Sequence, residues 1–158
     1  MDHLWSPWRF QYVSNADKPA GCIFCQKPLA NSDEEHLIFY RGNHNFGILN
    51  LYPYTNGHLM IVPYQHAAAL NEVEPHVLTE MIELARRAER ALTEVYRPKG
   101  INIGMNLGEC AGAGIAGHIH MHVLPRWPGD VNFMTAIGET RVLVEDIHTT
   151  YKKLRAAF

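Results

Sequence analysis

The sequence at positions 117–126 reads Gly117-His118-Ile119-His120-Met121-His122-Val123-Leu124-Pro125-Arg126. Its polar and apolar residues alternate, which is the period of a half-buried β-strand. We therefore expect the three histidines on one face, and Ile119, Met121 and Val123 in a core on the other. Side chains that share a face of a strand lie roughly 6.5–7 Å apart. That spacing suits a row of nitrogens along a chain of phosphates or around a metal.

A single histidine on such a strand is more often a packed core residue than a functional one. Here three stand in register with no carboxylate between them, which favours chemistry over packing. The chain holds ten histidines among its 158 residues, the one oddity of its composition. Because imidazole changes charge near neutral pH, this excess indicates site chemistry in that range.

Length and charge limit the classes of protein. Residues 1–158 are enough for a single domain with its own core. The formal net charge is −2 and the densest basic cluster is Arg86, Arg87 and Arg90, so we expect no extended nucleic-acid groove. No segment approaches the ~20 apolar residues of a membrane span. Acidic Asp2 and the lack of a secreted disulfide framework predict a cytoplasmic protein.

The order of elements predicts an α+β fold with a mostly antiparallel sheet. Apolar residues recur with helical spacing between Val77 and Val95, with Pro75 at the start and Pro98 after the end. Strands are expected over 37–40, 46–49, 58–63, 101–106 and from 118 onward, a short extended piece over 141–144, and a terminal helix over 146–158. Residues 1–20 are aromatic-rich, and form either a cover over the core or a partner subunit, or an aromatic wall for a substrate base.

Two further motifs carry possible chemistry. The loop 108–117 holds four glycines and can turn backbone N–H groups toward an anion, although flexible connections look the same. Cys22 and Cys25 form a CxxC pair, which is typical of a redox pair or half of a metal site. We see no βαβ context that would favour the redox reading.

Taken together, these motifs resemble the histidine-triad family, whose signature is His-φ-His-φ-His-φ-φ with φ apolar. The resemblance covers nearly the whole chain, including the CxxC pair, Asn50, residues 57–63 with His66, and residues 101–126. Residues 106–140 are most similar to the bacterial branch of diadenosine tetraphosphate phosphorylases and hydrolases. The resemblance implies the family's five-stranded antiparallel sheet with one long helix and a C-terminal helix.

It also implies nucleotidyl transfer. His120, the middle histidine, would attack the α-phosphate of a dinucleoside polyphosphate, and water or phosphate would then release the nucleotide from His120. Imidazole is largely unprotonated near neutral pH and is a competent nucleophile there. His122, on the same face, is placed to hold a phosphate oxygen or help the leaving group. A phosphoramidate hydrolase of the Hint type and a non-catalytic nucleotide-binding module stay open as alternatives.

The resemblance assigns binding roles to several polar positions. Asn50 matches a ribose-binding position, Asn106 a position near the phosphates, and His58 a position that supports the phosphate site. Each has an ordinary alternative, as a loop asparagine or a strand-end surface histidine. The loop backbone at Gly112, Ala113 and Gly114 would face the phosphates. Many relatives carry a glutamine followed by a hydroxyl residue there, and its absence leaves the choice between water and phosphate open.

Zinc-bearing relatives supply a fourfold ligand set that this chain also contains: Cys22, Cys25, His66 and His118. We therefore expect one structural zinc, with the sulfur and nitrogen ligands that closed zinc sites use. This assignment removes His118 from the chemistry. Family members are usually dimers that join two sheets edge to edge, so a homodimer is also expected. Cys110 has no partner in this scheme.

Overall fold

The computed structural model describes residues 21–130 and 143–158. The aromatic segment 1–20 and the first half of the expected extended piece over 141–144 lie outside these ranges. Within them the chain forms a five-stranded sheet in the order β1-β2-β3-β5-β4, in which every neighbouring pair is antiparallel. The strands are β1 (Ile38–Arg41), β2 (Asn45–Leu49), β3 (Leu59–Pro63), β4 (Gly100–Met105) and β5 (Met121–Arg126).

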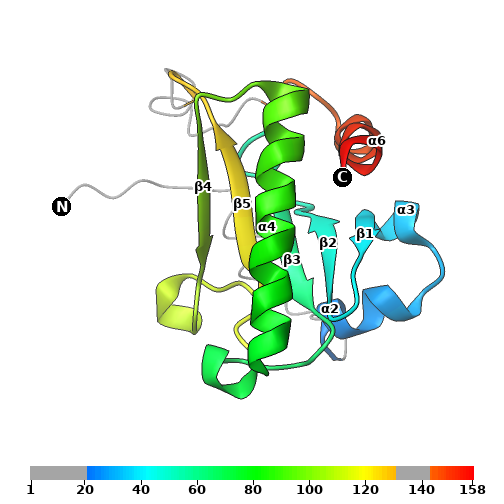
Figure 1. Ribbon diagram of the computed structural model, residues 1–158, viewed down its shortest axis with the longest axis vertical. Helices are drawn as coiled ribbons and strands as arrows, with labels where there is room; N and C mark the ends of the chain where they lie inside the picture. The colour runs from blue at the N-terminus through cyan, green and yellow to red at the C-terminus, as the bar shows by residue number, and fades with distance from the viewer. Residues whose placement is uncertain (1–20, 131–142) are drawn as a thin grey trace.

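Helix α4 (Pro75–Tyr96) runs along one face of this sheet, and α6 (Ile147–Ala157) lies beside it (Figure 1). Pro75 occupies the first turn, where its missing N–H costs no hydrogen bond. The buried face of α4 carries Val77, Met81, Leu84, Ala85, Ala88, Ala91 and Leu92. The fold class, the antiparallel sheet and both expected helices are thus confirmed.

Apolar residues fill both faces of the sheet. The larger core lies against α4 and α6, and it takes Ile119, Met121 and Val123 as the alternation predicted. A smaller core on the other face joins Phe24 to strand residues such as Phe46 and Ile48. Phe24 belongs to the short helix α2 (Ile23–Gln26). This helix therefore covers the face of the sheet on which the histidines stand.

Short elements complete the described chain: η1 (Lys27–Leu29), α3 (Asp33–His36), η2 (Leu70–Glu72) and η3 (Glu109–Ala111). The expected strand over 37–40 is wrong at its start, because Leu37 takes a left-handed conformation (φ 60°) that ends α3. No helix among residues 21–130 and 143–158 combines the length and apolarity that a membrane crossing needs.

The expected strand from residue 118 is wrong for its first half, since β5 begins at Met121. The pairing of Ile61 with Met121 would place Pro63 opposite Ile119, and proline has no N–H for the ladder. The Ile119 N–H donates to the Ala67 carbonyl instead, at 2.8 Å. His118 and His120 therefore stand on the irregular segment that leads into β5.

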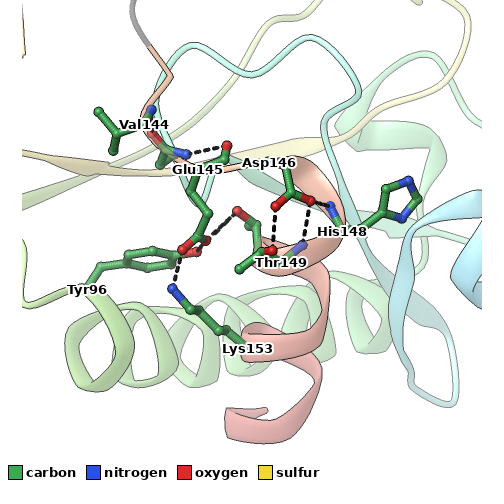
Figure 2. Close-up of polar contacts among 9 residues, drawn as sticks. Tyr96, Val144, Glu145, Asp146, His148, Thr149 and Lys153 are labelled. Atoms are coloured by element: carbon green, nitrogen blue, oxygen red, sulfur yellow. Dashed lines mark hydrogen bonds and ion pairs between the residues drawn. The ribbon is translucent and has the colours of Figure 1, made fainter.

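The C-terminal segment is anchored by polar contacts (Figure 2). The Asn56 amide donates to the Glu145 carbonyl at 3.0 Å and accepts from the Val144 N–H at 2.9 Å. The Glu145 carboxylate accepts from the Tyr96 hydroxyl at 2.6 Å and pairs with Lys153. Asn56 lies in the loop before β3, so these bonds connect this loop to α4 and α6.

Candidate active site and metal-ligand cluster

The three histidines meet other side chains at the start of β5. His118 and His120 are buried, with 0% and 5% of their surface exposed, and His122 is half-buried. The Phe24 ring packs on both buried rings, with centroids 5.5 Å from His118 and 5.1 Å from His120. Each imidazole has a different hydrogen-bond partner, and these partners fix the tautomer of each ring.

His120 has one nitrogen held and one nitrogen left for chemistry. Its Nδ1 lies 2.9 Å from the His118 carbonyl oxygen. A carbonyl only accepts, so Nδ1 carries the proton and Nε2 keeps its lone pair. Burial lowers the pKa of His120, while the bond to the carbonyl opposes this. The ring is therefore neutral at physiological pH, with an unprotonated nitrogen, which is the form a nucleophile needs.

His122 is held in the opposite tautomer through His58. The Nδ1 of His58 accepts from the Tyr54 backbone N–H at 3.2 Å and lies 3.2 Å from the Asn50 amide nitrogen. His58 therefore carries its proton on Nε2, which lies 2.9 Å from Nδ1 of His122. The Nδ1 of His122 accepts this bond, so its own proton sits on Nε2. His120 thus presents a lone pair, and His122 presents a donor.

Acid is expected to destabilise the fold through His122. Burial, and second the charge of nearby His120, lower the pKa of His122 to about 4. An unfolded histidine titrates at about 6.5, so the unfolded chain binds more protons between these values. The free energy of unfolding then falls as pH falls through this window. Urea unfolding midpoints from about pH 7 to about pH 4.5 measure the slope.

The matched variants for this test are His122→Asn and His148→Asn. His148 is exposed on α6 and serves as the control. We expect His122→Asn to flatten the pH dependence of the midpoint and His148→Asn to leave it unchanged. An equally steep slope in all three proteins would contradict the assignment to His122.

The third histidine, His118, faces a cluster of metal-ligand side chains. Its Nε2 donates to the Pro63 carbonyl at 2.9 Å, which leaves Nδ1 unprotonated. That Nδ1 lies 3.3 Å from Cys22 Sγ, 3.6 Å from Cys25 Sγ and 3.3 Å from His66 Nδ1. The ligand atoms of all four residues lie within 4.8 Å of one another. The sequence expectation that these four residues come together is confirmed.

The donor set suits zinc. Two sulfurs and two imidazole nitrogens are a common ligand set of closed tetrahedral zinc sites. Burial, and second the neighbouring Cys22, raise the pKa of the Cys25 thiol. Two adjacent thiolates repel each other unless a cation lies between them, so these residues fit a bound divalent ion.

A pocket opens beside His120 and His122. Its volume is about 140 Å³, below the ~300–1,000 Å³ of sites that enclose a whole drug-sized ligand, so it can enclose one ring system. The polar groups in its lining include Asn50, His120 and His122. Its apolar lining includes Ile23, Phe24, Ile48, Leu51, Met60 and Ile115.

A family model of the HIT domain matches residues 31–129. The chain belongs to the histidine-triad (HIT) family. The AP-4-A phosphorylase of Mycobacterium tuberculosis is 38% identical over 161 residues, covering 98% of this HIT chain and 83% of that protein. The asymmetrical bis(5'-nucleosyl)-tetraphosphatase of Schizosaccharomyces pombe is 29% identical over 93 residues, covering 59% of this chain and 50% of that protein.

Solved structures agree with the family. A Zn-bound histidine triad family protein from Mycobacterium smegmatis superposes on this HIT chain with a TM-score of 0.69 at 31% identity. The match covers 87% of this chain and 92% of that one. The expected HIT fold is therefore confirmed.

The structure brings together only some of the binding residues that the sequence indicated in this HIT protein. Asn50, Gly112 and Gly114 line the pocket, whereas Asn106 and Ala113 do not. The Asn106 amide instead reaches the Gly112 carbonyl at 3.5 Å, so it supports the loop. His58 lies behind His122 rather than in the pocket lining. This position is consistent with the expectation that His58 supports the phosphate site.

Other pocket residues were not predicted from the sequence, among them Phe24, Tyr54 and Lys27. Phe24 lies inside the CxxC motif, in which the two cysteines are the residues that indicate chemistry. Tyr54 acts through its backbone N–H, which no residue type announces. Lys27 belongs to no motif, and lysines are usually solvated.

Proposed function

We propose that this HIT protein is an enzyme that cleaves dinucleoside polyphosphates at the α-phosphate through a covalent nucleotidyl-His120. The observation that carries the proposal is the pair of opposite tautomers, a lone pair on His120 beside a donor on His122, in the lining of a pocket for one ring system. The names of the two relatives, an AP-4-A phosphorylase and a bis(5'-nucleosyl)-tetraphosphatase, support this substrate class.

In the first half of the reaction, Nε2 of His120 attacks the α-phosphorus. The bond between this phosphorus and the bridging oxygen breaks, and its electron pair leaves with the remaining polyphosphate. The Nε2–H of His122 donates to the oxygen that gains charge. The carbonyl of His118 holds Nδ1–H of His120, and so stabilises the positive charge that the ring acquires.

In the second half, an acceptor oxygen attacks the same phosphorus and the P–N bond breaks, which restores His120. Phosphate and water are the two candidate acceptors. The loop before the triad, which reads Gly112-Ala113-Gly114-Ile115, has no side chain that could orient water. A Cβ added at Gly112 would meet only the Asn106 amide nitrogen, at 3.9 Å, so the backbone there has open space for an anion. We therefore propose phosphate as the main acceptor.

Incubation with diadenosine tetraphosphate, with and without phosphate, tests the proposed function. We expect ADP and ATP when phosphate is present, and about tenfold slower turnover to AMP and ATP without it, since phosphate is the better-placed nucleophile. Products are resolved by anion-exchange chromatography. Equal rates of AMP and ATP formation in both reactions would contradict the phosphate acceptor. No turnover of this substrate, with turnover of adenosine phosphoramidate, would contradict the substrate class.

Asn50 would bind the ribose in this scheme. It lines the same pocket as His120 and His122. Its carbonyl oxygen accepts from the Tyr52 N–H at 3.1 Å, while its amide nitrogen points to His58. These bonds fix the orientation of the amide beside the expected sugar position.

We further propose that Cys22, Cys25, His66 and His118 hold a structural zinc ion. Bound there, zinc supplies a cross-link between the N-terminal segment and the start of β5, and takes no part in the transfer. The Zn-bound Mycobacterium smegmatis relative supports this proposal.

A homodimer through β4 is also proposed. β4 is an edge strand of the sheet, and Ile103 on it has 48% of its surface exposed. Exposed edges with apolar side chains are surfaces that proteins tend to cover.

A cytoplasmic location is proposed as well, because thiolate ligands are maintained in a reducing compartment.

A further inference from the structure

The hydrogen-bond donor of His122 depends, through His58, on the loop of residues 50–57 between β2 and β3. Two groups of this loop hold Nδ1 of His58: the Tyr54 N–H at 3.2 Å, and the Asn50 amide nitrogen at the same distance. Loss of both donors would allow the proton of His58 on either ring nitrogen. It would thereby weaken the bond that keeps the proton of His122 on Nε2.

The middle of this loop is exposed, and side chains near its end attach it to the rest of the fold. Leu51 and Tyr52 each have 53% of their surface exposed, so packing alone fixes this part of the loop weakly. The Thr55 hydroxyl donates to the Pro125 carbonyl of β5 at 3.1 Å. The next residue, Asn56, makes a second attachment.

Asn56 uses both groups of its amide on one backbone segment. The amide donates to the Glu145 carbonyl at 3.0 Å and accepts from the Val144 N–H at 2.9 Å. Asn56 follows Tyr54 by two residues, so the bonded amide and the N–H that holds His58 are separated by at most ~7 Å of chain. A displacement of Asn56 would therefore be felt at the bond to His58.

The segment that Asn56 contacts is itself fixed by the Glu145 side chain (Figure 2). Its carboxylate accepts from the hydroxyl of Tyr96 on α4 at 2.6 Å and of Thr150 on α6 at 2.9 Å, and it pairs with Lys153. Burial alone would raise the pKa of Glu145, but these three donors outweigh it and lower the pKa overall. The attachment point of the loop is thus held by two helices.

We propose that Asn56 is a positioning residue for the transfer reaction. Its two bonds hold the loop where the Tyr54 N–H meets His58, and His58 then keeps the proton of His122 on Nε2. Asn56 does not belong to the lining of the pocket beside His120, so it acts without touching the substrate. The inference rests on the proposed function, and adds to it a residue that fixes the donor of the same site.

The tautomer of His122 tests the inference without any substrate. Long-range ¹H–¹⁵N NMR spectra of protein labelled at histidine show which ring nitrogen carries the proton. We expect a single Nε2–H form in the wild type and a mixture of both tautomers in Asn56→Ala. Asn71→Ala removes the same amide at an exposed position of η2, and should keep the single form. A single Nε2–H form in Asn56→Ala would overturn the inference.

A double-mutant cycle in kcat separates positioning from a general structural role. Asn56→Ala should lower kcat by about tenfold, a part of the ~10²–10⁴-fold that a positioned acid contributes, with KM nearly unchanged. In a His122→Asn background the same change should have no further effect, since the donor is already gone. Asn71→Ala should keep the wild-type kcat. Equal losses in both backgrounds would overturn the inference, as would an unchanged kcat in Asn56→Ala.

Tyr96→Phe weakens the same attachment without changing Asn56. It removes the hydroxyl that donates to Glu145 and keeps the aromatic ring. We expect the same changes in tautomer and kcat, smaller than in Asn56→Ala. If Asn56→Ala does not fold, wild-type values of both quantities in Tyr96→Phe would overturn the inference. A wild-type protein without turnover would contradict the proposed function, and the tautomer of His122 would still decide the role of Asn56.

Discussion

Replacement of His120 by Ala is expected to abolish the covalent intermediate and to lower kcat by about 10⁴-fold or more, as losses of catalytic nucleophiles do. The Nε2 lone pair of His120 is the nucleophile of the proposed mechanism, and its Nδ1 proton is held by the His118 carbonyl at 2.9 Å. Incubation with α-³²P-labelled substrate and quenching in base preserves the P–N bond, so the labelled protein measures the intermediate.

The controls for this prediction separate chemistry from folding. His148→Ala removes an exposed histidine and should retain both labelling and turnover. His120→Gly leaves a cavity that free imidazole can enter, so added imidazole should restore part of the turnover without labelling the protein. Labelling that survives in His120→Ala would assign the nucleophile to another residue, and failure of imidazole together with a lost fold would reveal a structural role.

The alternation of residues 118–123 was enough to place the histidines on one face of the sheet and the apolar residues in the core. It could not place the start of β5. The ladder stops where Pro63 would face Ile119, and that pairing depends on the register between two strands far apart in sequence. The alternation of polar and apolar residues shows which face of the sheet a side chain occupies. The register between paired strands decides where their hydrogen bonding ends.

The tautomers of the three histidines could not be predicted from the sequence either. They follow from the Pro63 and His118 carbonyls and from the Tyr54 N–H, which are backbone groups present at every position. The metal-ligand cluster was predictable only through the family resemblance. Cys25, His66 and His118 are far apart along the chain, and this separation does not tell how close their side chains lie in the fold. Lys27 had no sequence signal, because its place in the pocket lining depends on the tertiary fold.

Removal of zinc is expected to lower the Tm of the loaded protein by about 10 °C. The estimate takes ~3–4 kcal/mol from a tightly bound ligand and ~2–4 °C of Tm per kcal/mol for a chain of this size. Elemental analysis of protein purified without chelator should find about one zinc per chain. The Cys22→Ser/Cys25→Ser double variant should bind none and melt at the temperature of the chelated wild type.

Cys110→Ser is the matched control, because Cys110 is exposed and lies outside the cluster. It should keep both the zinc and the Tm. Zinc loss should also lower kcat. The ion would hold the His118 ring in place, and the carbonyl of the same residue holds the ring of His120. A chelated protein with unchanged Tm and turnover would refute the zinc site. Unchanged Tm with lower turnover would instead assign the ion to the positioning of His120 and not to stability.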